Sequence, residues 1–327
     1  MKLKFNFLTF LFLLLVFSAC GGGGSSQGTS LSEKPSSRAL SAPAEADDLP
    51  GLLQTLDELA EIERSGSWFQ GLALTESGIR EKTGDYAGAV VAAFKELAWA
   101  YGRGLIQKAE LEQGLLNVLT VEGEETVTAT VNAILAFING QWESAATGLS
   151  SLFNELDEPD GFGRWMLLVC LLEKNKEDRR ACAAYKAIRA RYTQFPEYWY
   201  RGAKAFSGTI AAEFAESCIN SAVQGPFAED CRKILASNSG LRIEDGLSIK
   251  TKREIDAIIS QSVNSGSPQF LDSLFPLISL PDNPYTVYAI GALRAVINVP
   301  KFRDYFNGQA ASSSGRLTER LSYLCRI

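Results

Sequence analysis

The amino-acid sequence predicts an all-α protein: an α-solenoid of stacked antiparallel helix pairs, followed by a further helical region at the C-terminus. Apolar residues recur at helical spacing from Asp48 onward, whereas the alternating runs typical of strands are scarce. Gly and Pro interrupt the chain roughly every 12 to 20 residues, which is the rhythm of short helices joined by tight turns. In the middle of the chain, one pattern of side chains also recurs at a fixed interval of about 34 residues, a period typical of stacked helix pairs.

The N-terminus has the features of an export signal. Two lysines precede an apolar run at 5–17, and a segment of small residues ending in Cys20 follows. The run is shorter than the roughly 20 residues that a membrane-spanning helix needs. We therefore expect residues 1–19 to be a signal peptide. Phe17-Ser18-Ala19-Cys20 resembles a bacterial lipobox, which implies that Cys20 is lipidated and anchors the protein to a membrane; plain secretion is the alternative.

Residues 20–47 are rich in Gly, Ser, Ala and Pro and poor in large apolar side chains. Such a segment cannot bury enough surface to compensate for the entropy lost on ordering, so we expect a flexible tether. Removal of residues 1–19 takes away two of the 32 Lys and Arg and none of the 38 Asp and Glu, which changes the net charge from −6 to −8. This acidic balance argues against nucleic acid as a partner.

The repeated pattern lies within residues 48–236. Six pairs of side chains stand at the same interval: Trp165 and Trp199, Val169 and Ala203, Leu172 and Phe206, Ala181 and Ala215, Tyr185 and Ile219, and Ile188 and Ala222. The pattern resembles the tetratricopeptide (TPR) repeat, in which an aromatic residue begins the first helix and small residues stand where the two helices touch. Small residues let helix axes approach to about 8 Å. We interpret residues 48–236 as a TPR-like repeat domain.

The C-terminal part continues the helical signals without the repeat. Past Leu235 no side-chain pattern recurs at the interval found in the middle of the chain. Thr251 and Glu254 form the signature of a capping box at the start of a helix. Residues 248–327 are therefore predicted to form a separate helical cap or a degenerate set of repeats.

The TPR resemblance implies a binding groove on the concave face, which the first helix of each pair lines. Carried over position by position, the candidate groove residues are Met166, Cys170, Glu173, Lys174, Glu197, Tyr200 and Lys204. Met166 and Tyr200 would supply apolar contact, while Glu173 and Lys204 would fix the orientation of the ligand.

Five cysteines follow Cys20, and no two of them are spaced as CxxC, so neither a zinc site nor a thioredoxin-like motif is indicated. A disulfide joining Cys218 to Cys231, or Cys170 to Cys182, is compatible with export. The favoured interpretation is that all five are buried thiols that act as small apolar side chains.

The chain contains no histidine, which excludes Ser-His-Asp and Cys-His catalytic groups and histidine-ligated metals. We predict no catalytic residue, no metal site and no cofactor. One fragment, Glu76-Ser77-Gly78 upstream of Gly104-Leu105-Ile106-Gln107, looks like the Glu-Ser and Gly-Leu-x-Gln motifs of lytic transglycosylases. There a glutamic acid protonates the glycosidic oxygen. A solvated residue on an ordinary helix is the favoured interpretation of Glu76.

These features predict a non-enzymatic lipoprotein of the bacterial cell envelope, held through Cys20 on the outer membrane and facing the periplasm. The TPR resemblance implies a protein-interaction scaffold whose partners are other envelope proteins, as in repeat lipoproteins that serve outer-membrane assembly. One alternative is a solute-binding accessory lipoprotein, similar to those found beside TRAP-type transporters. A lytic transglycosylase is the weaker alternative.

Overall fold

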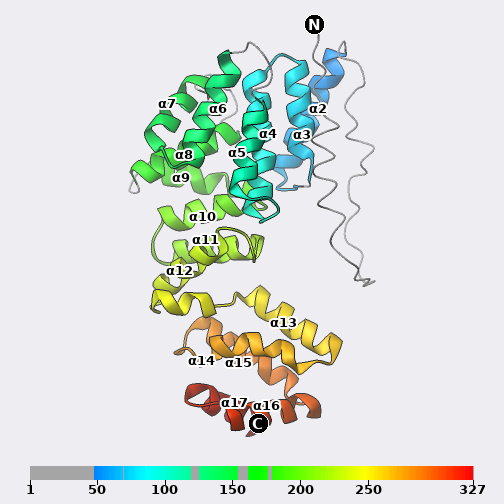
Figure 1. Cartoon of the computed structure of the whole chain (residues 1–327), viewed down its shortest axis with the longest axis vertical. Helices are drawn as coiled ribbons and strands as arrows, with labels where there is room; N and C mark the ends of the chain where they lie inside the picture. Colours follow the sequence, from blue (N-terminus) through cyan, green and yellow to red (C-terminus); the bar gives the residue numbers. More distant parts are fainter. Residues whose placement is uncertain (1–47, 69, 119–124, 154–160, 176–178, 327) are drawn as a thin grey trace. The chain divides into compact units, whose positions relative to one another are not determined.

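The computed structural model describes residues 48–68, 70–118, 125–153, 161–175 and 179–326. These residues form sixteen α-helices and three short 3-10 helices, and none of them lies in a strand. The prediction of an all-α protein is thereby confirmed for the described part of the chain (Figure 1). The predicted signal peptide at 1–19, the lipidated Cys20 and the tether at 20–47 lie outside the described residues.

The helices follow one another with short connections. The α-helices are α2 (Leu49–Arg64), α3 (Leu72–Lys82), α4 (Tyr86–Gly102), α5 (Lys108–Val118), α6 (Glu125–Ile138), α7 (Trp142–Phe153), α8 (Phe162–Lys174), α9 (Arg179–Ala187), α10 (Pro196–Ala205), α11 (Gly208–Ser221), α12 (Ala228–Asn238), α13 (Lys252–Ser265), α14 (Phe275–Ser279), α15 (Pro284–Val296), α16 (Pro300–Ser312) and α17 (Arg316–Arg326). The 3-10 helices are η1 (Arg189–Tyr192), η2 (Ile243–Ser248) and η3 (Pro268–Leu274).

Side-chain caps fix where several of these helices begin. The Asp48 carboxylate accepts from the Gly51 amide at the start of α2, and the Asp85 carboxylate accepts from the Gly88 amide at the start of α4. At α13 the Thr251 hydroxyl and the Glu254 side chain form the predicted capping box. These contacts satisfy amides that the first helical turn leaves without a partner.

Neighbouring helices pack against each other along the chain, most extensively α3 on α4, α6 on α7, α10 on α11 and α11 on α12. Helix α4 also contacts α6, α8 and α10. Its residues are buried almost continuously from Ala89 to Ala100, as expected for a helix that is enclosed on all sides. The N-terminal half is therefore organised around α4.

Most of the twelve residues of the repeated pattern lie in the core. Ten of the twelve are buried, and Phe206 and Ala222 are the two that are partly exposed. Trp165 on α8 lies against Phe137, Phe162 and Tyr192. Trp199 on α10 lies against Phe214 of α11. Four of the six pairs are therefore buried at both positions.

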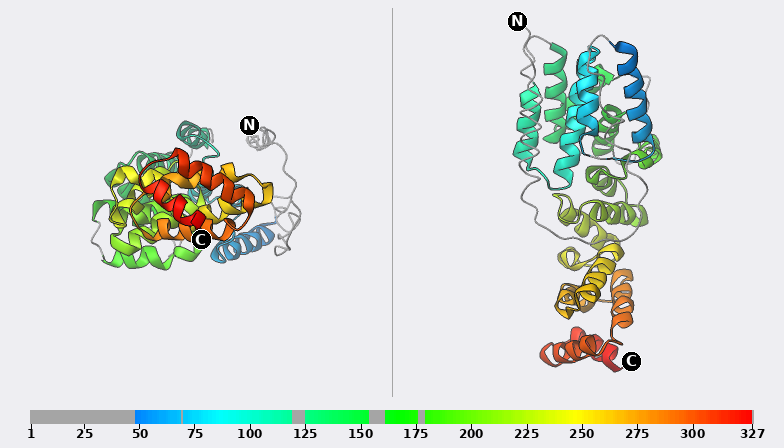
Figure 2. Two further views of the ribbon diagram at one scale, coloured as in Figure 1. Left: turned by 90° about the horizontal axis from the view of Figure 1, so that it is seen from below. Right: turned by 90° about the vertical axis from the view of Figure 1, so that its right-hand side faces the viewer.

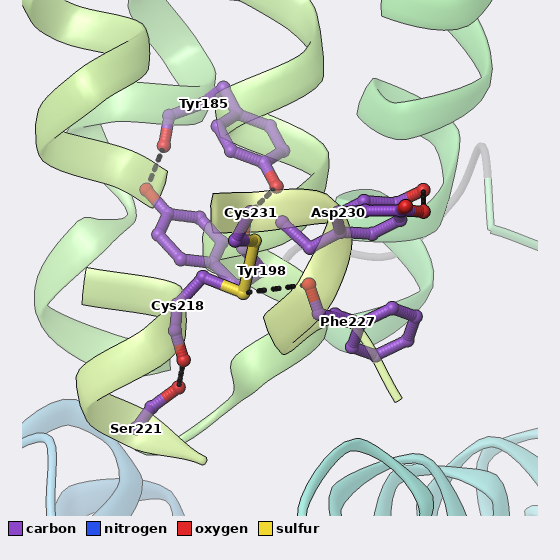
Figure 3. The surroundings of a disulfide bond; sticks show 8 residues. Tyr185, Tyr198, Cys218, Ser221, Phe227, Asp230 and Cys231 are labelled. Carbon is purple, nitrogen blue, oxygen red and sulfur yellow. Dashed lines mark hydrogen bonds between the residues drawn. A yellow bond between two sulfur atoms is a disulfide. The ribbon is translucent and has the colours of Figure 1, made fainter. Parts of the chain in front are cut away.

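One disulfide crosslinks consecutive helices. Cys218 of α11 bonds to Cys231 of α12, with 6.5 Å between their Cα atoms (Figure 3), a separation within the usual range. The favoured interpretation of all five later cysteines as thiols is wrong for this pair, because the turn after α11 brings the two side chains together. Cys170 and Cys182 do not pair with each other, and both remain thiols together with Cys325.

The helices from α2 to α17 belong to one compact unit of the chain. Within it, the C-terminal helices α13–α17 lie beyond α12, at the opposite end from α2–α7 (Figures 1 and 2). Polar contacts join them to the preceding helices. The Arg232 guanidinium of α12 donates to the Glu254 carboxylate of α13, where Nη1 lies 3.1 Å from Oε2, and Thr251 donates to the Asn220 side-chain oxygen at 2.6 Å. Within the described ranges, no helix has the combined length and hydropathy needed to cross a membrane.

Candidate functional site

Four of the predicted groove residues gather around Arg201, a residue of α10. Arg201 lies one helical turn after Glu197, and its Nε and Nη2 atoms are 3.2 and 3.1 Å from Glu197 Oε1. Its Nη1 atom is 3.4 Å from Glu173 Oε1 at the end of α8. Lys204 Nζ contacts the same Glu173 oxygen at 3.2 Å. Two carboxylates and two cations therefore form one network between α8 and α10.

The local sequence favours this arrangement. Pro196 occupies the start of α10, where its fixed φ suits a first helical turn. Glu197 lies in that first turn and Lys204 in the last, so each charge is favourable with respect to the helix dipole. Glu197 and Arg201 have the spacing at which side chains on one helix face meet. The helix therefore presents the network along one of its faces.

Aromatic rings surround the Arg201 guanidinium. Its Cζ atom lies 4.9 Å from the ring centre of Trp142 on α7 and 5.6 Å from that of Tyr200. Tyr200 in turn stacks on Phe227, with ring centres 4.7 Å apart and planes 14° from parallel. Arginine over aromatic faces gains cation–π attraction in addition to its ion pairs. We call these residues the Arg201 face: Trp142, Glu173, Glu197, Tyr200, Arg201, Lys204 and Phe227.

The Arg201 face is half-buried, and its charged side chains are paired. Burial acts to lower the pKa of Arg201, but the Glu197 and Glu173 carboxylates outweigh it and raise this pKa above its ordinary value. The arginine side chain is 12% exposed, and of the seven residues only Glu197 is buried. The face is therefore a preformed surface with both charge signs and several rings.

Three predicted groove residues lie elsewhere. Met166 and Cys170 have no exposed surface, because α8 is enclosed by α4, α7 and α10. Burial raises the pKa of the Cys170 thiol to about 12. Lys174 is exposed and turns toward Glu143 on α7, with 3.3 Å between Nζ and Oε1. Neither Met166 nor Cys170 can touch a ligand without rearrangement of the core.

Sequence reasoning missed Arg201, Trp142 and Phe227 as members of the site. The spacing of Glu197 and Arg201 is a readable signal, because acid and base four residues apart on a helix form pairs. Trp142 comes from α7 and Phe227 from the turn before α12, both separated in the sequence from Arg201, and their approach depends on how these elements pack. No local pattern contains that information.

Glu76 lies in a second polar cluster, between α2, α3 and α4. It is not the solvated residue that the sequence favoured, because its side chain is 15% exposed and binds both Lys95 and Arg80. Burial acts to raise the pKa of Glu76, but these two cations outweigh it and lower the pKa to about 2. A general acid near neutral pH needs the opposite shift. Among the residues that the structure describes, no group of three or more potential ligands could hold a metal ion.

Comparison with known proteins finds no matching family model, no matching curated protein and no matching solved structure.

Proposed function

We propose that this protein is a lipid-anchored binding scaffold of the bacterial cell envelope, built from TPR-like helix pairs and acting without catalysis. In this proposal Cys20 carries the lipid, residues 20–47 form the tether, and the helical part faces the periplasm from the outer membrane. Other envelope proteins are the partners.

The observation that carries the proposal is the Arg201 face. Arg, Tyr and Trp are the residue types that contribute most of the binding energy in protein interfaces, and here Trp142 of α7 lies beside Tyr200 and Arg201 of α10. Their ion pairs and ring contacts hold them in place before any partner arrives. A preformed surface loses less side-chain entropy on binding than a flexible one.

The burial of the repeated pattern supports the assignment to TPR-like pairs. Trp165 and Trp199 begin corresponding helices, α8 and α10, and Ala181 and Ala215 are buried in the helices that follow, α9 and α11. In a stack of such pairs the first helices line one surface. The Arg201 face belongs mainly to α8 and α10, which are the first helices of two pairs.

The interaction is tested by affinity purification from detergent-solubilised envelopes. Tyr200→Ala with Lys204→Ala removes exposed parts of the Arg201 face, and Val287→Ala on α15 is the matched control because its side chain is 60% exposed and distant in the chain. We expect the double variant to lose a stoichiometric partner that the wild type and the control retain. Equal recovery with all three proteins would contradict the role of this face.

The anchor is tested separately with Cys20→Ser. We expect the wild type to remain in the membrane fraction with a diacylglyceryl group on Cys20, detectable by mass spectrometry of the N-terminal peptide. The variant should appear in the soluble periplasmic fraction. A wild-type N-terminal peptide without lipid would refute this part of the proposal.

A solute-binding accessory role is the second candidate. The observation that favours it is a cavity of about 370 Å³ between α2 and α3, which has both polar and apolar walls. Volumes of about 300 to 1,000 Å³ are typical of small-molecule sites. Native mass spectrometry of the purified protein is the appropriate measurement, and a co-purifying small molecule would favour this role.

A further inference from the structure

The cavity between α2 and α3 combines apolar and acidic walls. Leu53, Leu56 and Ala60 of α2 provide its apolar surface. Asp57 and Glu63 of the same helix also line it, and Glu76 and Arg80 of α3 complete the polar side. A ligand placed here would contact both aliphatic carbon and charged oxygen.

Buried charges hold the polar wall in position. Lys95 of α4 is 4% exposed, and its Nζ atom lies 3.0 Å from Glu63 Oε2 and 2.8 Å from Glu76 Oε2. Arg80 binds Glu76 at 2.8 Å and Asp85 at 2.7 Å. Each cation is therefore already shared between two carboxylates.

The charge of the cluster is unbalanced in favour of anions. The carboxylates of Asp57, Glu63 and Glu76 line the cavity, and Asp85 binds the lining residue Arg80; only the two cations of Lys95 and Arg80 oppose these four carboxylates. An anionic ligand would meet repulsion from this excess, whereas a cation would reduce it. The net negative charge around the cavity therefore favours cationic ligands.

Acceptor oxygens also remain for a ligand. Asp57 makes no ion pair or hydrogen bond with any residue in the described ranges, and Glu63 uses Oε2 but not Oε1. Both residues line the cavity. Hydrogen bonds from an ammonium group to carboxylates are roughly twice as strong as those between neutral groups. These two residues are the acceptors best placed for an ammonium group.

We propose that the cavity between α2 and α3 is a binding site for an aliphatic ammonium ion, with Asp57 and Glu63 as the charge-recognising residues and Leu53, Leu56 and Ala60 as the surface for the methylene chain. A free alkyl diamine and the side chain of a lysine on another protein share this chemistry. The site is separate from the Arg201 face, so its failure would leave the proposed scaffold function intact.

Titration calorimetry of the full-length protein in detergent with 1,5-diaminopentane tests the proposal at pH 7, where both amines are charged. Pentane-1,5-diol is the neutral ligand of the same length. Asp57→Asn is the clean variant, because Asp57 is exposed and has no partner among the described residues. Glu58→Gln is its matched control, since it removes the same charge from the next residue of α2, which does not line the cavity. Glu63→Gln is the second variant.

We expect the wild type and Glu58→Gln to bind the diamine with equal affinity. Asp57→Asn and Glu63→Gln should bind it with an affinity lower by about tenfold or more. The diol should not bind. Absence of diamine binding to the wild type, equal binding of the diol, or equal weakening by Asp57→Asn and Glu58→Gln would each overturn the proposal.

N-acetyl-lysine methylamide, tested in the same way, distinguishes the two sources of the ammonium group. Binding as tight as that of the diamine would support a lysine side chain as the ligand, because one ammonium then suffices. Binding of the diamine alone would support a free diamine. Circular dichroism of each variant confirms that the helices are intact.

Discussion

Tyr185 and Tyr198 exchange hydrogen bonds with each other's backbone. The Tyr185 hydroxyl donates to the Tyr198 carbonyl at 2.5 Å, and the Tyr198 hydroxyl donates to the Tyr185 carbonyl at 2.7 Å (Figure 3). Their rings stack with centres 4.7 Å apart and planes 4° from parallel. Both side chains are fully buried. This pair fixes α9 against α10, and thus one side of the element that carries Arg201.

Tyr198→Phe should lower the free energy of unfolding by about 1 to 3 kcal/mol, because it leaves the Tyr185 carbonyl without its donor. Tyr185 lies in the last turn of α9, where carbonyls lack a partner within the helix. Urea denaturation measures the change. Tyr200→Phe is the control, since it removes only a 3.4 Å contact to Asp230. An equal effect of both substitutions would contradict the role of the buried pair.

Arg201→Leu should destabilise the protein by roughly 2 to 4 kcal/mol, because it leaves Glu173 and Glu197 without their shared cation. Arg201→Lys should recover only part of this loss, since an ammonium group cannot bind both carboxylates as a planar fork. Thermal unfolding at neutral pH compares the two variants. Lys204→Ala, which removes a partly exposed partner of Glu173, should change stability far less. A ranking with Lys204→Ala as the most damaging substitution would be inconsistent with the network described.

Glu96 predicts a pH dependence of stability. Its side chain is 3% exposed, Oε1 accepts from the Gly71 amide at 2.9 Å, and Oε2 has no hydrogen-bond partner. Burial raises the pKa of Glu96 from 4.5 to about 7, although the Gly71 amide opposes the shift. The folded state then binds more protons than the unfolded state between these two values, so stability should fall as pH rises through this window and level off above it.

The expected decrease is of the order of a few kcal/mol. Glu96→Gln keeps the acceptor for Gly71 and removes the titration, so its stability should be nearly constant over the same window. Urea denaturation at several pH values from 4.5 to 8 measures both proteins. Wild-type and variant curves with the same slope would show that Glu96 does not titrate in this range.

The Cys218–Cys231 disulfide should stabilise the protein by about 3 kcal/mol, as expected for a crosslink that closes a loop of this size. The two residues are 13 positions apart. Comparison of unfolding with and without a reductant measures the effect, and replacement of both cysteines by serine should reproduce it. Peptide mapping without reduction should return the two peptides linked.

In the native protein Cys170 should resist alkylation, because its thiol is buried and has a raised pKa.

Local sequence patterns predict the helices, whereas contacts between helices distant in the sequence determine which residues are accessible at the site. The capping box at Thr251 follows from a short-range sequence signal, and the positions of Trp165 and Trp199 near the starts of helices follow from the repeated pattern. The position of Met166 and Cys170 in the repeat implies a location in a groove, yet contacts of α8 with α4 and α10 cover them. Such contacts join helices that are separated in the sequence by other helices.

The burial of Lys95 and Glu96 is a second feature that local sequence patterns do not predict. Lysine and glutamate are residue types that usually lie on the surface, whereas in the structure both of these side chains are buried. The reason is that α4 is surrounded by α3, α6, α8 and α10. Their neighbours, and hence the cavity charge and the raised pKa of Glu96, depend on the packing of helices that no single segment encodes.

Site-specific photo-crosslinking in living cells tests most directly that the Arg201 face binds an envelope partner. A photo-reactive phenylalanine analogue replaces Tyr200 on the face or, as the reference position, Val287 on α15. The proposed binding role of the Arg201 face predicts a discrete crosslinked product from position 200 that position 287 does not give and that Lys204→Ala diminishes. No product at position 200, or the same products at both positions, would contradict it.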